Sequence, residues 1–176
     1  DAATYYFGVF PHLILNQKES FVFKGRNRRP PKDAVNAMLS FVYTLISNDV
    51  TAALETVGLD PYVGFMHALR PGRPSLALDI MEELRAYLGD RLVLSLINRK
   101  QITGNQFLQQ GDESIIMTDD ARRTIISAWQ ARKKEQIQHP FLNEKVSIGL
   151  LPHIQAMMLA RYLRNDLDDY PVFLIQ

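Results

Sequence analysis

His67, Asp79 and Glu82 are the residues whose types and spacing favour chemistry. Asp79 and Glu82 are three positions apart, so in a helix their carboxylates share one face. His67 precedes them in a segment, 67–74, whose prolines and glycine predict a loop that folds back over this helix. An imidazole beside carboxylate oxygens suits Mn²⁺ and, less strictly, Mg²⁺. The three residues therefore predict a metal site that polarises a phosphoryl oxygen or stabilises a leaving oxygen.

Spacing alone leaves a plainer interpretation open. Acidic residues three apart are common on solvated helix faces, and Glu83 beside Glu82 extends such an acidic patch. A single loop histidine is more often a hydrogen-bonding residue than a metal ligand. Spacing by itself therefore favours the acidic surface over the metal site.

Basic residues form two candidate DNA contacts. The stretch 24–32 is a cationic loop that cannot be regular helix, and a shorter loop after His67 carries two further arginines. Guanidinium groups bind phosphate through paired hydrogen bonds, and such contacts make affinity depend on salt. A solvated basic loop is the alternative. The DNA-binding candidates are Arg26, Arg28, Arg29, Arg70 and Arg73.

The elements that must position these residues are mainly helices. Apolar residues at spacings of three and four, with suitable residues at the ends, predict helices over 33–46, 50–57, 76–88, 90–99, 119–137 and roughly 145–165. Asp33, Ser75 and Thr118 suit helix starts, and Gly58 suits a helix end. Pro152 is expected to kink the last helix or to move its start later. A short extended piece is expected at residues 20–24.

Composition limits the class of protein. With 176 residues and a net charge of +1, the chain is not basic overall, so DNA contact must rest on local clusters. The absence of cysteine excludes disulfides, thiolate zinc sites and a cysteine nucleophile. No apolar run approaches the ~20 residues that cross a bilayer, and no signal peptide is recognised. We expect no membrane association.

Three stretches together resemble the CRISPR adaptation integrase family. Residues 58–67 (GLDPYVGFMH) and 72–82 (GRPSLALDIME) are similar to that family's signature. Residues 28–43 (RRPPKDAVNAMLSFVY) look like the helix that precedes it. The resemblance covers residues 1–100 well and is weaker but compatible beyond them.

The resemblance implies an all-α fold, the helical catalytic domain that follows a small β-rich domain in this family. We expect one domain over residues 1–176, with a flexible tail at 168–176 and at most a short extended or hairpin segment near 20–24. The family's metal ligands are a glutamate, a histidine and a later acidic residue. By position these imply His67 and Glu82, with Asp79 as a second acidic residue of the site.

The family's first glutamate has no counterpart in this chain. The resemblance implies that it lies just before residue 1, since neither Glu19 nor Glu55 has a matching context. We therefore expect this fragment to be inactive unless another segment or chain supplies that ligand.

The implied activity is that of a metal-dependent DNA endonuclease and integrase, which inserts short spacer DNA into a CRISPR array by transesterification in antiviral defence. Mg²⁺ or Mn²⁺ is the implied cofactor. The implied partners are DNA (spacer precursor and CRISPR repeat), a second copy in a homodimer and a small second CRISPR adaptation protein, in the cytoplasm.

Two other functions remain open. One is a non-catalytic helical DNA-binding or scaffold module. The other is a different metal phosphohydrolase, although the tandem His-Asp pair common in that class is absent.

Overall fold

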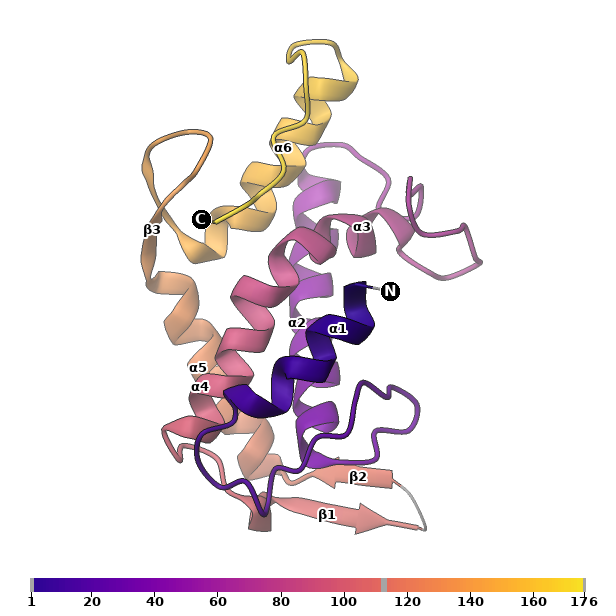
Figure 1. Ribbon diagram of the computed structural model, residues 1–176. Coiled ribbons are helices and arrows are strands. Elements are labelled where there is room, and N and C mark those ends of the chain that lie inside the picture. Colours follow the sequence, from indigo (N-terminus) through magenta and orange to yellow (C-terminus); the bar gives the residue numbers. More distant parts are fainter. Residues whose placement is uncertain (1, 112–113, 176) are drawn as a thin grey trace. The chain divides into compact units, whose positions relative to one another are not determined.

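The computed structural model describes residues 2–111 and 114–175. Residues 1, 112–113 and 176 lie outside the described part. Residue 1 is the first residue of the predicted domain, and residue 176 is the last residue of the predicted tail. Helices dominate the fold, and two short antiparallel strand pairs accompany them (Figure 1). The predicted all-α class is confirmed, with small hairpins added.

The described residues gather into two compact units. The first unit combines the residues up to Tyr43 with Gly89–Trp129, and the second combines Thr44–Leu88 with the residues from Gln130 onward. Each unit is thus built from two separate stretches of the chain. A single domain over residues 1–176 stays a prediction.

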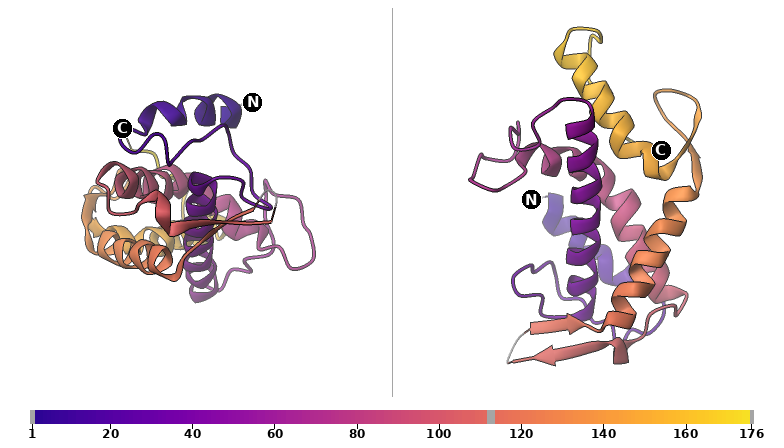
Figure 2. Two further views of the ribbon diagram at one scale, coloured as in Figure 1. Left: turned by 90° about the horizontal axis from the view of Figure 1, so that it is seen from below. Right: turned by 180° about the vertical axis from the view of Figure 1, so that it is seen from behind.

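The first unit brings the N-terminal helices together with one strand pair. β1 runs antiparallel to β2, and Ile115 N donates to Pro31 O at 2.8 Å, so β2 lies beside the segment that enters α2 (Figure 1, Figure 2). The elements are α1 (Ala2–Val9), the 3₁₀ turn η1 (Phe10–Leu13), the first part of α2 (Ala34–Thr56), α4 (Arg91–Asn98), the 3₁₀ turn η3 (Gly104–Gln106), β1 (Phe107–Gln110), β2 (Ser114–Met117) and most of α5 (Asp119–Lys134).

The second unit carries the candidate site. Its helices α3 and α6 pack together, and β3 pairs antiparallel with β4. The elements are the rest of α2, α3 (Ser75–Leu84), the start of the π-helical turn η2 (Arg85–Asp90), the end of α5, β3 (Gln136–Gln138), β4 (Lys145–Ser147), the 3₁₀ turn η4 (Ile148–Leu150) and α6 (Leu151–Leu163).

Three of the four predicted capping residues lie at helix ends. Asp33 Oδ1 accepts from Asn36 N at 2.7 Å, and Thr118 Oγ1 accepts from Ala121 N at 3.2 Å. Gly58 ends α2 with a φ of 81°, a conformation that glycine adopts without strain. The prediction of Ser75 as a cap is wrong. Ser75 is the first residue of α3, and its buried hydroxyl donates to Ala68 O at 3.2 Å.

Several predicted boundaries need correction. The segments 33–46 and 50–57 form one continuous helix, α2, because the polar residues between them continue its hydrogen-bonded backbone. The helices predicted at 76–88 and 90–99 are joined through the π-helical turn η2. The last helix begins at Leu151 with Pro152 in its first turn, where proline is tolerated because that N–H needs no helical partner.

The predicted β element is misplaced. Residues 20–24 form turns and irregular backbone and no strand, and the strand pairs lie at 107–117 and 136–147. Phe21 and Phe23 are nevertheless buried, so this segment contributes to the core. Side-chain burial, and not strand pairing, explains its apolar pattern.

Helix α2 is long and apolar enough to cross a membrane by length and composition, contrary to the expectation that no such run exists. Its apolar face is buried inside the protein, which is the pattern of a core helix. The fully buried residues of this face are Val35, Met38, Leu39, Val42, Ile46, Val50 and Leu54.

Candidate active site

The loop between α2 and α3 is folded back onto the start of α3. Leu76 N and Ala77 N both donate to Pro61 O, at 2.9 and 3.2 Å. The Ser75 hydroxyl contacts Ala68 O further along the same loop. These bonds use the N–H groups that a helix start leaves without helical partners, and they bring His67 beside α3.

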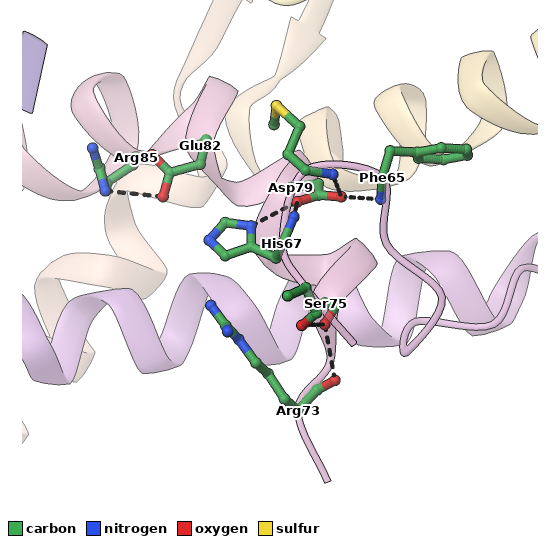
Figure 3. Close-up of polar contacts among 9 residues, drawn as sticks. Phe65, His67, Arg73, Ser75, Asp79, Glu82 and Arg85 are labelled. Carbon is green, nitrogen blue, oxygen red and sulfur yellow. Dashed lines mark hydrogen bonds and ion pairs between the residues drawn. The ribbon is translucent and has the colours of Figure 1, made fainter. Parts of the chain in front are cut away.

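Asp79 organises this loop from the first turns of α3. Its Oδ2 accepts hydrogen bonds from Phe65 N at 2.6 Å and Met66 N at 3.0 Å, and its Oδ1 accepts one from His67 N at 3.0 Å (Figure 3). Burial alone raises the pKa of Asp79, but the hydrogen bonds from Met66, His67 and Phe65 outweigh it, so the pKa lies below its ordinary value. Asp79 is therefore an ionised, buried carboxylate that holds three consecutive backbone N–H groups.

The same carboxylate orients the imidazole of His67. Nδ1 of His67 lies 2.6 Å from Oδ1 of Asp79, and because Asp79 is ionised, Nδ1 carries the proton and donates it. In the neutral ring, Nε2 then keeps a free lone pair. The His67 side chain is 24% exposed. Histidines that bind metals commonly donate through one ring nitrogen to a carboxylate and bind the ion through the other.

Gly64 permits the close approach of the loop to α3. A Cβ at this position would lie 2.7 Å from the backbone carbon of Ser75 and 2.9 Å from Oδ2 of Asp79. No side chain fits there without moving the loop, because these atoms are backbone or a hydrogen-bonded carboxylate. Asp79 can make its hydrogen bonds to the loop only because residue 64 is a glycine.

Glu82 lies one turn after Asp79, as its spacing predicts. Its Oε1 accepts a hydrogen bond from Nη1 of Arg85 at 3.0 Å, and its side chain is 32% exposed. The carboxylate and the His67 ring lie toward the same side of α3 (Figure 3). Arg85 is a part of the site that the sequence interpretation missed, although its spacing of three from Glu82 marks it as a partner.

The donor set fits a divalent metal only in part. His67 Nε2 and the Glu82 carboxylate are suitable donors for Mn²⁺ or Mg²⁺. Asp79 already accepts four hydrogen bonds, two on each oxygen, so its geometry favours orienting His67 over binding the ion. Among residues 2–111 and 114–175, no group of three His, Asp or Glu side chains is placed to hold an ion. A complete site needs at least one further ligand.

Arg70 and Arg73 lie in the loop that carries His67. Within the described residues, neither guanidinium group makes a hydrogen bond or ion pair, and Arg70 is exposed. The Arg73 side chain extends on the side of the loop where the His67 ring lies (Figure 3). Both cations are available to an anionic ligand, as a phosphate contact requires.

The loop before α2 separates into internal and exposed arginines. Arg26 donates to Asn36 Oδ1 at 2.8 Å and to Ser40 Oγ at 3.0 Å, and its guanidinium lies 5.3 Å from the centre of the Tyr43 ring. Arg26 is thus an internal residue of the first unit. Arg28 and Arg29 are exposed and remain candidates for phosphate contact.

The sequence is similar to known proteins over nearly its whole length. The family model described as CRISPR associated protein Cas1 matches residues 1–131. The CRISPR-associated endonuclease Cas1 2 of Rhodospirillum rubrum is 57% identical over 171 residues, which are 97% of this chain and 50% of that protein. The CRISPR-associated endonuclease Cas1 1 of Chlorobaculum tepidum is also 57% identical, over 98% of this chain and 50% of that protein. The chain thus spans about half the length of these two relatives.

Two solved structures share the fold. A Cas1 protein from Thermotoga maritima superposes with a TM-score of 0.82 at 29% identity, over 93% of this chain and 49% of that one. A chain of a Cas6-RT-Cas1–Cas2 complex gives a TM-score of 0.84 at 27% identity, over 99% of this chain and 19% of that one. Because the family model matches most of the chain and the helical fold agrees, this chain belongs to the CRISPR-associated Cas1 family.

Proposed function

We propose that the protein is a metal-dependent DNA endonuclease and integrase that inserts short spacer DNA into a CRISPR array. The observation that carries the proposal is the His67–Asp79 pair beside Glu82, which leaves one imidazole nitrogen and one carboxylate for a metal. The curated relatives are named CRISPR-associated endonucleases, which supports DNA cleavage chemistry.

In this proposal His67 Nε2 and Glu82 hold Mg²⁺ or Mn²⁺, with the third ligand coming from outside the described residues. The bound ion supplies Lewis-acid stabilisation of charge on the scissile phosphate. Asp79 keeps the proton on Nδ1 and fixes the ring plane. Arg85 restrains the Glu82 carboxylate through its hydrogen bond of 3.0 Å.

Arg70 and Arg73 bind and orient the DNA phosphates beside His67. Strand transfer joins the 3′-hydroxyl oxygen of the spacer to a phosphorus of the CRISPR repeat and breaks that phosphorus's bond to the leaving 3′-oxygen, which takes up a proton. Positioned cations lower the barrier because negative charge grows on the oxygens of the phosphate in the transition state.

The proposed partners are DNA, a second copy of the chain and a small second adaptation protein. One structural relative is part of a complex of Cas1 with Cas2, which supports the last of these. Spacer acquisition on genomic DNA implies a cytoplasmic location.

The test is Mn²⁺-dependent cleavage and strand transfer by the full-length protein on a DNA carrying a CRISPR repeat. His67→Ala and Glu82→Ala are expected to abolish both reactions, because each removes a proposed ligand. His12→Ala, a change at an exposed histidine of the first unit, is the matched control and keeps activity. Full activity in either site variant would refute the assignment.

A non-catalytic DNA-binding or scaffold role is the second candidate. It is favoured by the lack of a three-ligand cluster among the residues that the structure describes. DNA binding without cleavage at any Mn²⁺ concentration, unchanged by His67→Ala, would support it over the integrase.

A further inference from the structure

A half-buried carboxylate, that of Glu83, anchors the C-terminal segment of the chain. After α6 the chain reverses and runs back along that helix (Figure 1). Glu83 Oε1 accepts from the Tyr170 hydroxyl at 2.6 Å, and Oε2 accepts from Phe173 N at 2.8 Å and from Gln155 Nε2 at 2.8 Å. The stretch predicted as a flexible tail is therefore fastened, at Tyr170 and Phe173, to the helix that carries Glu82.

Gln155 and His139 complete this polar cluster. Both side chains are fully buried, and Gln155 Nε2 also lies 3.0 Å from the Tyr170 hydroxyl and 3.2 Å from Pro171 O. His139 Nδ1 accepts from two backbone N–H groups, so its Nε2–H donates to Gln155 Oε1 at 3.3 Å. Every polar group of this cluster has a partner, which makes the docked position of residues 170–173 specific.

A second contact joins the segment to the turn that follows Glu83. The Phe173 ring is 2% exposed and packs against Tyr87 with ring centres 5.9 Å apart. Tyr87 belongs to the π-helical turn, which departs from the regular α-helical bonding pattern. Arg132 also contacts Tyr87, donating to Tyr87 O at 3.0 Å with its guanidinium 5.1 Å from the ring centre.

These contacts converge on the turn that restrains Glu82. Arg85, the residue that binds the Glu82 carboxylate, lies between Glu83 and Tyr87, both of which the C-terminal segment contacts. The segment touches neither His67 nor Glu82 in any described contact. Its effect on the site must therefore pass through residues 83–87.

We propose that Tyr170–Phe173 is an intramolecular brace that, through Glu83 and Tyr87, fixes the turn carrying Arg85 and so positions Glu82 for metal binding. Tyr170 and Phe173 are positioning residues in this account. The inference rests on the proposed function for the role of Glu82, whereas the brace itself rests on the hydrogen bonds and ring contacts alone.

The test uses Tyr170→Phe and Phe173→Ala, with Leu174→Ala as matched control because Leu174 is 70% exposed in the same segment. Amide hydrogen exchange is measured over residues 82–88, and Mn²⁺ binding by electron paramagnetic resonance. We expect both brace variants to exchange faster in that turn and to bind Mn²⁺ about 10-fold more weakly. A loss of about 10-fold is the smaller end of the decrease in metal affinity seen when a residue that supports a metal ligand is removed. The rate of cleavage at saturating Mn²⁺ should change much less, and Leu174→Ala should change nothing.

Unchanged exchange over 82–88 in Phe173→Ala would overturn the brace. Faster exchange with unchanged Mn²⁺ binding would overturn its role for Glu82. Tyr170→Phe decides the question if Phe173→Ala does not fold, since it removes only one hydroxyl. If the parent protein binds no Mn²⁺, the proposed function fails, while the exchange measurement still judges the brace separately.

Discussion

Asp79 shows how one side chain can hold a loop and orient a histidine. Its two oxygens hold the loop through three N–H groups and orient His67 through a fourth contact. A change at Asp79 would therefore disturb the fold of the loop and the histidine together. Gly64 offers a way to test the packing of this loop without removing a hydrogen-bonding side chain.

Gly64→Ala is expected to destabilise the protein by about 1–3 kcal/mol, since its Cβ would overlap Ser75 and Asp79. Mn²⁺ binding should weaken with it, because the loop and His67 move together. Urea denaturation measures the first effect and metal titration the second. Gly8→Ala is the control: nothing lies within 4 Å of its Cβ, and alanine in a helix should gain about 0.5–1 kcal/mol. Equal stability of the two variants would contradict this packing.

His139 predicts a pH dependence of stability. Burial lowers the pKa of its imidazole below the ordinary value of 6.5, with the hydrogen bond that the ring donates to Gln155 opposing the shift. At a pH well above 6.5 the His139 ring is neutral in both the folded and the unfolded chain. As pH falls below that value, the unfolded chain takes up the proton first, so the free energy of unfolding decreases. In His139→Asn, whose carbonyl can still accept the two backbone N–H groups, the loss of stability between about pH 7 and pH 5 should be shallower. An equally steep loss would show that other groups cause it.

At the scale of elements, α2 is the principal core helix. Leu39 is fully buried, and Leu39→Ala should cost about 2–5 kcal/mol through lost burial and the cavity left behind. Asn48→Ala, at an exposed position of the same helix, should change stability by less than about 0.5 kcal/mol. Thermal denaturation compares the two, and similar melting temperatures would be inconsistent with α2 as a core element.

The sequence predicted the positions of the helices better than the boundaries and connections between them. The apolar stripe of α2 is visible in the spacing of Val35, Leu39, Val42 and Ile46, but Ser47–Asp49 resembled a break because polar residues there follow the exposed face. The strand pairs were missed since Phe107–Gln110 is short and half polar. Strand pairing depends on the partner strand, which local pattern does not reveal.

The candidate site was predicted in part. Spacing placed Asp79 and Glu82 on one helix, and the family resemblance selected His67. The role of Asp79 depends on backbone N–H groups of a folded loop, and no pattern of side chains specifies these. Arg26 was grouped with Arg28 and Arg29 because charge alone does not distinguish an internal arginine from an exposed one.

At the scale of the whole molecule, the net charge of +1 means that DNA affinity must come from local clusters. Arg28→Ala and Arg29→Ala should each weaken DNA binding and reduce the slope of log affinity against log salt by about 0.9, with stability unchanged. Arg26→Ala should instead lower the melting temperature, because it removes the hydrogen bonds that Arg26 donates to Asn36 and Ser40. Fluorescence anisotropy over a salt series measures the slopes. An unchanged slope in both exposed variants would remove this loop from the DNA interface.

The central claim is that the free nitrogen of His67 binds the metal while Asp79 holds the other nitrogen. Electron spin-echo envelope modulation of protein-bound Mn²⁺ detects a directly coordinated imidazole nitrogen. We predict a ¹⁴N coupling in the parent protein that disappears in His67→Ala and persists in His12→Ala. A coupling that survives His67→Ala, or none in the parent protein with Mn²⁺ bound, would contradict the account.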